Sequence, residues 1–321
     1  DGQVQSTSRA ELDERYRDRQ PLGQIGPGRE YVVRDTAMDR QAVLRILGPQ
    51  LVPTEGAAER LLGDVRRVAR LHHPAIAAIY DAGHDREGIY IVHEHVDGEP
   101  LRAVIDRQGP VDVPRAVQVL TRLAEALDYA HGLGLLARNL CPEKVYVNRS
   151  FEARIIDLGI GFRQQDVVAP GPAYRAPEVL AGNRADQAAD LYMLGALSWE
   201  MLFGQPPPIP AGEDGEPPEP PDGDGRTLPD ALKKVIQDCL VPDRTRRLGS
   251  ARELLEVLHG THLLPGALLA NRYEIVRELG RGGMGTVFAG RDLVLDEPVA
   301  MKVLGGPWDE TTEKRFIQEI R

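Results

Sequence analysis

The chain has 321 residues, an apolar content of 42% and a formal net charge of −10 at pH 7. This length suits two domains, or one large domain and part of another, and the negative charge disfavours nucleic acid and anionic membranes as partners. No apolar run approaches the length of a membrane span, and Cys141 and Cys239 give no disulfide framework. We therefore expect a globular protein of a reducing compartment, the cytoplasm, with no membrane segment.

The spacing of apolar residues predicts strands towards the front of the chain and helices behind them. Residues 1–11 are polar and lack periodicity, so we expect a frayed lead-in. Strands are predicted at Tyr31–Val33, Ala42–Leu47, Ile76–Asp81, Ile89–Val96, Val145–Val147 and Arg154–Ile156. Helices are predicted at Ala57–Leu71, Val113–Gly132, Gln187–Phe203, Leu228–Leu240 and Ala251–His259, with a mobile loop at Gln205–Thr227 and a linker at Gly260–Pro265. This order indicates an α+β fold in two lobes.

A glycine-rich turn lies between two strand-like runs near the end of the chain. The sequence Gly280-Arg281-Gly282-Gly283-Met284-Gly285 is followed at short range by Lys302 on a third strand-like run. Glycines let the backbone pass close over a polyphosphate with its N–H groups turned inward, and a lysine adds a positive charge. The alternative is a hairpin with a flexible turn. Strands on both sides of the turn argue against a dinucleotide-binding fold, which places a helix there.

The same pattern occurs 257 residues earlier, at a constant offset and without a gap. The positions that match their counterparts at this offset are Arg15, Tyr16, Leu22, Gly23, Gly26, Gly28, Arg34, Asp35, Asp39, Leu47 and Gly48. A repeat of this length is too long for a solenoid unit and suits a whole domain. We therefore expect one complete domain at 12–262 and the truncated start of a second at 267–321. The chain begins at Asp1 and stops at Arg321 inside an apparent helix, so we expect a longer parent protein.

The order of motifs resembles a bacterial-type, eukaryotic-like serine/threonine protein kinase across nearly all of residues 12–260. The matching segments are Ala137–Val145 at the catalytic loop, Asp157-Leu158-Gly159 at the metal-binding turn and Pro172–Glu178 at the end of the activation segment. The resemblance implies a bilobal fold with a β-rich first lobe and an α-rich second lobe. It also implies that Asp190 anchors the catalytic loop and that Arg247 pairs with Glu178.

The resemblance further implies that the first copy is catalytically inactive. Phosphoryl transfer needs phosphate positioning, metal ligands and a group for the substrate hydroxyl, and residues of each set are replaced. The degenerate positions are Arg45 for the β3 lysine, Asp64 for the helix-C glutamate, Asn139 for the catalytic aspartate, Cys141 for a phosphate-neutralising lysine and Lys144 for the metal-binding asparagine, which leaves Asp157 as the surviving metal ligand. We expect an ion pair between Lys144 and Asp157 and no Mg²⁺-dependent nucleotide binding. The alternative is that Lys144 extends into solvent.

The adenine slot of the first copy is also altered in comparison with the family. Glu30 and Val43 stand in its roof, Tyr146 in its floor and His93 at the gatekeeper position. A carboxylate facing a purine without a partner is costly, and a tyrosine opposite a valine leaves little room for a flat ring. Residues 158–173 contain no Ser, Thr or Tyr that could be phosphorylated. The histidine pairs 72–73 and 93–95 lack a third spaced ligand set, so we expect no metal site.

In the second copy the resemblance implies an intact ATP site that uses Mg²⁺ when the domain is complete. Its expected nucleotide-binding residues are Leu279, Gly280, Gly282, Gly283, Gly285, Val287, Ala300, Lys302 and Glu319, the last as the helix-C partner of the lysine. The first hypothesis is a tandem serine/threonine kinase in which the first copy regulates the second, with protein substrates or regulators as further partners. The alternatives are a non-catalytic signalling scaffold and a weak nucleotide-binding sensor.

Overall fold

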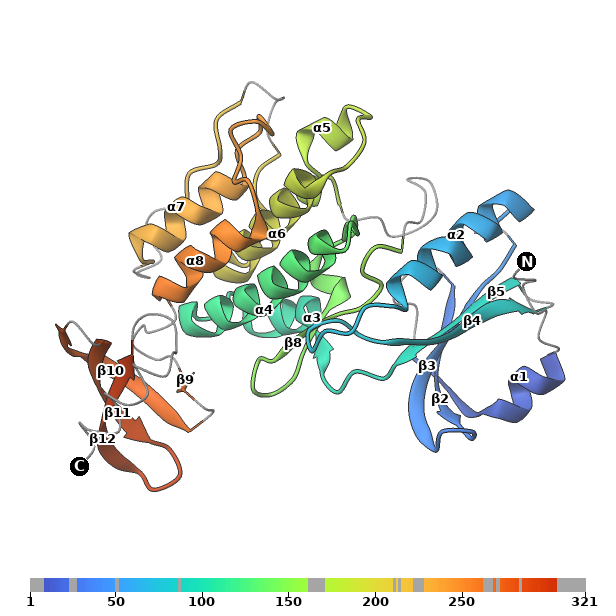
Figure 1. The fold of residues 1–321 in the computed structure, drawn as a ribbon, viewed down its shortest axis with the longest axis horizontal. Coiled ribbons are helices and arrows are strands. Elements are labelled where there is room, and N and C mark those ends of the chain that lie inside the picture. The colour runs from blue at the N-terminus through green and yellow to red at the C-terminus, as the bar shows by residue number, and fades with distance from the viewer. Residues whose placement is uncertain are drawn as a thin grey trace. The chain divides into compact units, whose positions relative to one another are not determined.

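A computed structural model describes residues 9–22, 28–49, 52–85, 88–160, 171–209, 212, 215–221, 228–261, 268–269, 272–282 and 285–304 (Figure 1). The chain divides into two units, residues 1–261 and residues 262–321. Each unit is described by itself.

The first unit begins with a five-stranded antiparallel sheet of order β1-β2-β3-β5-β4. Its strands are β1 (Tyr16–Pro21), β2 (Arg29–Asp35), β3 (Arg40–Leu47), β4 (Ile79–Asp85) and β5 (Gly88–Glu94). Helix α2 (Glu55–Val68) connects β3 to β4, and the hydroxyl of Thr54 caps it by accepting a hydrogen bond from the Ala57 N–H at 3.2 Å. The helix buries an apolar face that includes Leu62 and Val65. These elements form the first lobe.

A short helix, α1 (Arg9–Arg15), packs on the other side of this sheet from α2 (Figure 1). Leu12 and Tyr16 are each 1% exposed and form a small second core with apolar residues of the sheet, including Leu44. The prediction of a frayed lead-in is therefore wrong for residues 9–11, and residues 1–8 lie outside the described residues. Its helix contributes a single buried leucine, which is too little apolar periodicity to detect in a sequence.

The second lobe is mainly helical, and Figure 1 shows α4, α6, α7 and α8 gathered within it. Its helices are α3 (Leu101–Gln108), α4 (Val113–Gly132), α5 (Pro177–Leu180), α6 (Gln187–Phe203), α7 (Asp230–Cys239) and α8 (Ala251–Thr261), with 3₁₀ turns η1 (Pro142–Lys144) and η2 (Pro172–Tyr174). A three-stranded sheet of order β6-β7-β8 contains β6 (Glu99–Pro100), β7 (Val145–Val147) and β8 (Ala153–Ile155). Helix α6 is buried over nearly its whole length, because other elements cover it on all sides.

The bounds of α4, α6 and β7 agree with their predictions, whereas those of the other predicted helices and strands differ by a few residues. Helix α3 was not predicted. Helix α8 runs to Thr261, into the expected linker. Strand β4 begins at Ile79 rather than Ile76, because the backbone of residues 75–77 pairs instead with Ile155 of β8.

The second unit contains a four-stranded antiparallel sheet of order β12-β11-β10-β9. Its strands are β9 (Leu268–Leu269), β10 (Tyr273–Gly282), β11 (Gly285–Asp292) and β12 (Glu297–Leu304). Strands β10, β11 and β12 follow one another as an antiparallel meander, as β1, β2 and β3 do in the first unit. The two segments related by the 257-residue offset therefore have the same local topology.

Candidate functional site

The candidate site of the first unit is built around a buried ion pair that joins two neighbouring strands. Glu30 on β2 and Arg45 on β3 are directly opposed in the antiparallel register. Arg45 is fully buried and Glu30 is 4% exposed, and the Arg45 Nε donates a hydrogen bond to Glu30 Oε1. The strand register thus supplies the carboxylate of Glu30 with the partner that the sequence analysis did not assign to it.

Asp157 brings the second lobe into the same cluster. Arg45 Nη1 donates to Asp157 Oδ2 at 2.5 Å, and Lys144 Nζ donates to the same oxygen at 2.5 Å. Lys144 is 3% exposed, so the ion pair predicted between Lys144 and Asp157 is present and the lysine does not extend into solvent. Asp157 has a φ of 58°, a left-handed conformation that is uncommon for a residue with a side chain.

Burial and charge act in opposite directions on these groups. Burial by itself would raise the pKa of Asp157, but the charges of Arg45 and Lys144 hold that pKa well below its usual range. Burial raises the pKa of Glu30 and outweighs the charge of Arg45 beside it. Because Arg45 and Lys144 face Glu30 and Asp157, the cluster is balanced in charge when both carboxylates are ionised. It has no surplus positive charge to attract a polyphosphate.

His93 and Tyr146 complete the surroundings of this cluster. Burial, followed by the charge of Arg45, lowers the pKa of His93 to about 4, so its ring is neutral at pH 7. Its Nδ1 lies 2.9 Å from the carbonyl oxygen of Glu94, while its buried Nε2 has no hydrogen-bond partner among the described residues. Burial also raises the pKa of Tyr146 to about 12. Neither side chain therefore adds a charge to the cluster at neutral pH.

Asp64, at the helix-C position, does not join Arg45. Its carboxylate instead pairs with Arg67 on the same helix and lies 3.9 Å from Nη1 of Arg138 in the second lobe. Asp64 and Arg45 stand at positions whose family counterparts pair with each other. In this structure Arg45 pairs with Asp157 and Glu30 instead.

The segment at the catalytic-loop position is held in place by Asp190 of α6. Asp190 Oδ2 accepts a hydrogen bond from the Ala137 N–H at 2.7 Å, and Oδ1 accepts one from the Arg138 N–H at 2.9 Å. His131 Nε2 lies 2.8 Å from the same carboxylate. The anchoring role that the kinase resemblance implied for Asp190 is therefore present in the structure.

Asn139 and Cys141 stand in this segment at the positions where the kinase family has an aspartate and a lysine. The side-chain amide of Asn139 donates to the Asp157 carbonyl oxygen at 3.2 Å, and Asn139 has no carboxylate to take a proton. Burial raises the pKa of the Cys141 thiol to about 12, so the thiol is not ionised at neutral pH. The segment is held in position, and neither Asn139 nor Cys141 carries a charge at neutral pH.

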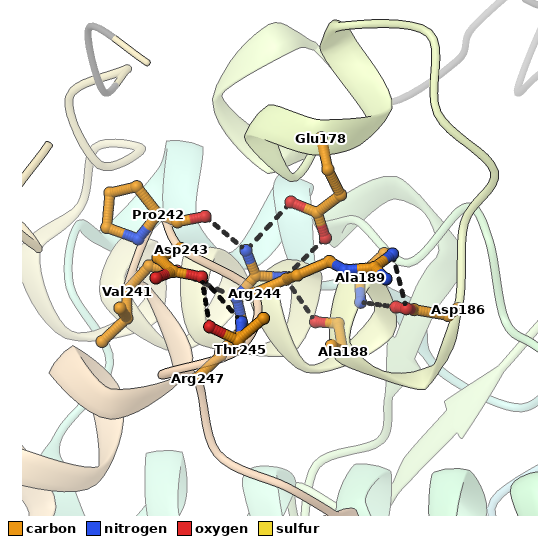
Figure 2. Close-up of polar contacts among 10 residues, drawn as sticks. All are labelled: Glu178, Asp186, Ala188, Ala189, Val241, Pro242, Asp243, Arg244, Thr245 and Arg247. Atoms are coloured by element: carbon orange, nitrogen blue, oxygen red, sulfur yellow. Dashed lines mark hydrogen bonds and ion pairs between the residues drawn. The ribbon is translucent and has the colours of Figure 1, made fainter. Parts of the chain in front are cut away.

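A second buried ion pair, between Arg247 and Glu178, lies within the second lobe (Figure 2). Arg247 Nη1 and Nη2 donate to the two oxygens of Glu178 at 2.8 and 3.0 Å, as the resemblance implied. The guanidinium also donates to the carbonyl oxygens of Val241, Pro242 and Ala188. This bidentate geometry is the strong form of an arginine–carboxylate contact.

In the second unit the structure places several of the expected nucleotide-binding residues on one meander. Val287 on β11 opposes both Gly280 on β10 and Lys302 on β12, and the pair Gly282–Gly285 closes the β10–β11 hairpin. Ala300 lies on β12 opposite Ala289, and Leu279 is 47% exposed. Gly283 and Glu319 lie outside the described residues, as do residues 23–27 and 161–170 of the first unit.

A family model described as a protein kinase domain matches residues 16–258. The chain belongs to the protein kinase family. It is 32% identical over 273 residues to the serine/threonine-protein kinase pkn2 of Myxococcus xanthus. This match covers 78% of this chain and 33% of that protein. It is 28% identical over 276 residues to the serine/threonine-protein kinase PknB of Mycobacterium tuberculosis, covering 80% of this chain and 44% of that protein. The chain thus spans between a third and a half of the length of these relatives.

The kinase fold is also shown by solved structures. The crystal structure of the Mycobacterium tuberculosis PknI kinase domain matches with a TM-score of 0.64 and 28% identity, over 77% of this chain and 96% of that chain. The first lobe with its sheet and the helical second lobe are therefore those of a protein kinase. Among the described residues no helix is long and apolar enough to cross a membrane.

The kinase family uses ATP and Mg²⁺ in general, and the residues of the first unit do not fit them. The Asp157 oxygen nearest the lysine already accepts from Arg45 and Lys144, and Lys144 puts a fixed positive charge beside that carboxylate. A divalent cation there would meet repulsion from two cations and would lack the oxygen of an asparagine.

Proposed function

We propose that this chain is the regulatory front part of a tandem serine/threonine kinase. Its first unit is a kinase domain that does not transfer phosphate and acts through contacts with proteins. Residues 267–321 begin a second kinase domain whose ATP and Mg²⁺ site forms when the rest of that domain is present. The observation that carries the proposal is the engagement of Asp157 by Arg45 and Lys144 in a buried, charge-balanced cluster.

The energetics of that cluster support the loss of nucleotide binding in the first unit. To coordinate a metal, Asp157 would have to give up hydrogen bonds to two buried cations. Each cation released without another partner would carry a desolvation cost of several kcal/mol. The charge of a polyphosphate could offset part of this cost, but Glu30, which is 4% exposed and bound to Arg45, would oppose its approach.

The repeat supports a second kinase domain. The glycine-rich turn, the valine after it and a lysine on the next strand all occur in the segment from Gly280 to Lys302, and Val287 and Lys302 are cross-strand neighbours. These are the residues that phosphoryl transfer needs for positioning phosphates. The relatives named as serine/threonine-protein kinases support Ser or Thr of proteins as the acceptor. The second domain itself is then the first unit's proposed intramolecular partner.

Calorimetric titration of the 321-residue chain with ATP, with and without Mg²⁺, tests the loss of nucleotide binding. We expect no saturable heat in the micromolar range under either condition. Lys302→Ala serves as the matched control, because heat that persists in it but disappears in Asp157→Asn would come from the first unit. Micromolar binding of that kind, strengthened by Mg²⁺, would overturn the proposal and favour the nucleotide-sensor alternative.

A further inference from the structure

Three ion pairs between described residues cross between the lobes of the first unit. One joins Arg154 on β8 to Glu94 on β5, and the other two have opposite polarity. In one pair a cation of the first lobe, Arg45 on β3, binds an anion of the second lobe, Asp157. In the other an anion of the first lobe, Asp64 on α2, faces a cation of the second lobe, Arg138, at 3.9 Å. The first pair is buried, with side chains 0% and 2% exposed, whereas the second is partly open to solvent at 16% and 43%.

The buried pair is the stronger of the two links. Attraction between charges grows as the local dielectric constant falls, and a partly exposed pair is screened by water and salt. Arg45 is also fixed from behind by Glu30 on the neighbouring strand, and Asp157 is fixed by Lys144 on η1. Each half of the link is therefore braced within its own lobe.

Separating the lobes would undo this arrangement at a cost. Moving the lobes apart would separate Arg45 from Asp157 and leave each with only its partner in its own lobe. The backbone also joins the lobes where Ala77 N–H donates to the Ile155 carbonyl and Ile155 N–H donates to the Ala75 carbonyl. The Arg45–Asp157 pair adds a buried attachment to this contact, to the partly exposed Arg154–Glu94 pair and to the chain connection.

We propose that the Arg45–Asp157 pair, assisted by Asp64 and Arg138, is a clamp that holds the two lobes in one fixed arrangement without nucleotide. The clamp goes beyond the proposed function, because it concerns the relative position of the lobes and not catalysis or the second domain. It gives the first unit a constant surface across both lobes, which a domain that acts through protein contacts requires.

The competing cause of a fixed arrangement is apolar packing. One continuous cluster of buried residues includes Leu62 and Val65 of α2 as well as apolar residues of the second lobe such as Leu158. If this packing alone sets the position of the lobes, removing the ion pair will not change it. An experiment must therefore remove the pair while leaving the packing and the charge balance intact.

The double variant Glu30→Gln/Arg45→Met meets this requirement. It removes one acid and one base, so the net charge is unchanged, and it leaves Asp157 paired with Lys144. The matched control is Arg34→Met/Asp39→Asn, which makes the same kind of change at an exposed pair within the first lobe. Spin labels at Glu59→Cys on α2 and Glu256→Cys on α8 report the distance between the lobes, since both positions are exposed and Cys141 and Cys239 are buried.

Pulsed electron–electron double resonance on the spin-labelled 321-residue chain is expected to give one narrow distribution of the distance between the labels, and Mg²⁺–ATP is expected not to alter it. In Glu30→Gln/Arg45→Met we expect the distribution to broaden by at least about twofold, and in the control to stay as it was. Circular dichroism verifies that each variant is folded, and if the double variant is not, Asp64→Asn, at the partly exposed link, is measured in its place with a smaller broadening expected. An unchanged distance distribution in a folded variant overturns the clamp. So does a broad distribution in the unsubstituted 321-residue chain that Mg²⁺–ATP narrows.

Discussion

The two copies of the strand meander differ at Glu30 and Arg45, whose counterparts are Val287 and Lys302, and agree in residues that hold the meander together. Arg15 pairs with Asp35 at 3.3 Å in the first copy, and Arg272 pairs with Asp292 at 2.6 Å in the second. The guanidinium of each arginine lies over the ring of the tyrosine that follows it, at 4.9 and 5.0 Å from the centroid. These contacts, which we call the frame, are the same in both copies, whereas Glu30 and Arg45 differ from their counterparts.

Details of the turn between the second and third strands agree in the same way. Asp39 and Asp296 have positive φ values of 48° and 57°, and their carboxylates pair with Arg34 and Arg291. A side chain at positive φ is uncommon outside Gly, Asn and Asp, so its occurrence at matching positions reflects one turn geometry. The repeat in the sequence is thus a repeat in local structure.

The changes at the site are coupled. Glu30 and Arg45 oppose one another across β2 and β3, and their counterparts Val287 and Lys302 oppose one another across β11 and β12. If only one of the two positions differed, a glutamate would face a buried lysine or a valine would face a buried arginine. In each case a different set of polar groups would need hydrogen-bond partners. With both changed together, Arg45 neutralises Glu30 and still reaches Asp157. The charge cluster of the first copy therefore depends on Glu30 and Arg45 together, and the second copy has neither residue at the matching positions.

The largest expected effect separates the copies by activity. In a parent protein that contains the complete second domain, we expect Lys302→Ala to lower phosphoryl transfer by about a thousandfold, because the lysine positions the phosphates. Arg45→Ala is expected to change it by no more than about twofold at saturating ATP, since the proposed function gives the first copy no catalytic group. Transfer of labelled phosphate from ATP to a protein substrate measures both. Full activity in the Lys302 variant would remove the assignment of the second copy.

The next effect concerns stability. Glu30→Ala leaves Arg45 buried with one of its two carboxylates gone, and we expect a loss of about 3 kcal/mol in the free energy of unfolding, at the low end for a broken buried pair. Arg34→Ala removes an exposed partner and should cost less than about 1 kcal/mol. Urea denaturation of the 321-residue chain, followed by circular dichroism, compares the two. Equal losses in both variants would show that the cluster is not a stabilising feature.

Much of the fold was readable from the sequence because the long helices have clear apolar patterns. Helix α4 begins and ends where its apolar periodicity does, and α6 coincides with a segment that is apolar on all sides. The kinase motifs placed Asp190, Arg247 and Asp157 because their order along the chain is preserved. Helices α1 and α3 went unpredicted, since short helices with few buried residues leave little periodic signal.

The charge cluster was only half predictable. The Lys144–Asp157 pair follows from two motif positions that meet in the family, whereas the contact between Arg45 and Asp157 joins residues 112 apart in the sequence. The Glu30–Arg45 contact did leave a signal. The two neighbouring predicted strands carry opposite charges at positions that face each other in a hairpin register. Aligning the two strands in that register predicts the Glu30–Arg45 contact from the sequence.

The third effect concerns nucleotide binding by the first copy. Replacing four positions with the family residues, Glu30→Val, Val43→Ala, Arg45→Lys and Lys144→Asn, removes the buried glutamate, opens the roof and introduces a metal-ligand amide. We expect this variant to bind Mg²⁺–ATP with a Kd of about 1 mM or tighter, worth about 4 kcal/mol, where the parent chain shows none. Titration of the same variant carrying Asp157→Asn is the control and should show no binding. A folded variant that remains unable to bind would mean that residues beyond these four block the site.

The smallest effect tests whether the shared frame has the same electrostatics in solution. Hydrogen bonds from Arg272, together with the Val294 and Leu295 N–H groups, lower the pKa of Asp292 to about 2. Because the folded-state pKa lies below the unfolded value of about 3.9, the carboxylate contributes stability above that value, and the contribution is lost as the pH falls towards 2. Arg272→Met should return the pKa towards its usual range, whereas Arg291→Met, at the neighbouring exposed pair, should leave it unchanged. Carboxyl carbon shifts followed by NMR from pH 6 to pH 2 give both values, and an Asp292 pKa near 4 before any substitution would mean that the frame pair does not hold in solution.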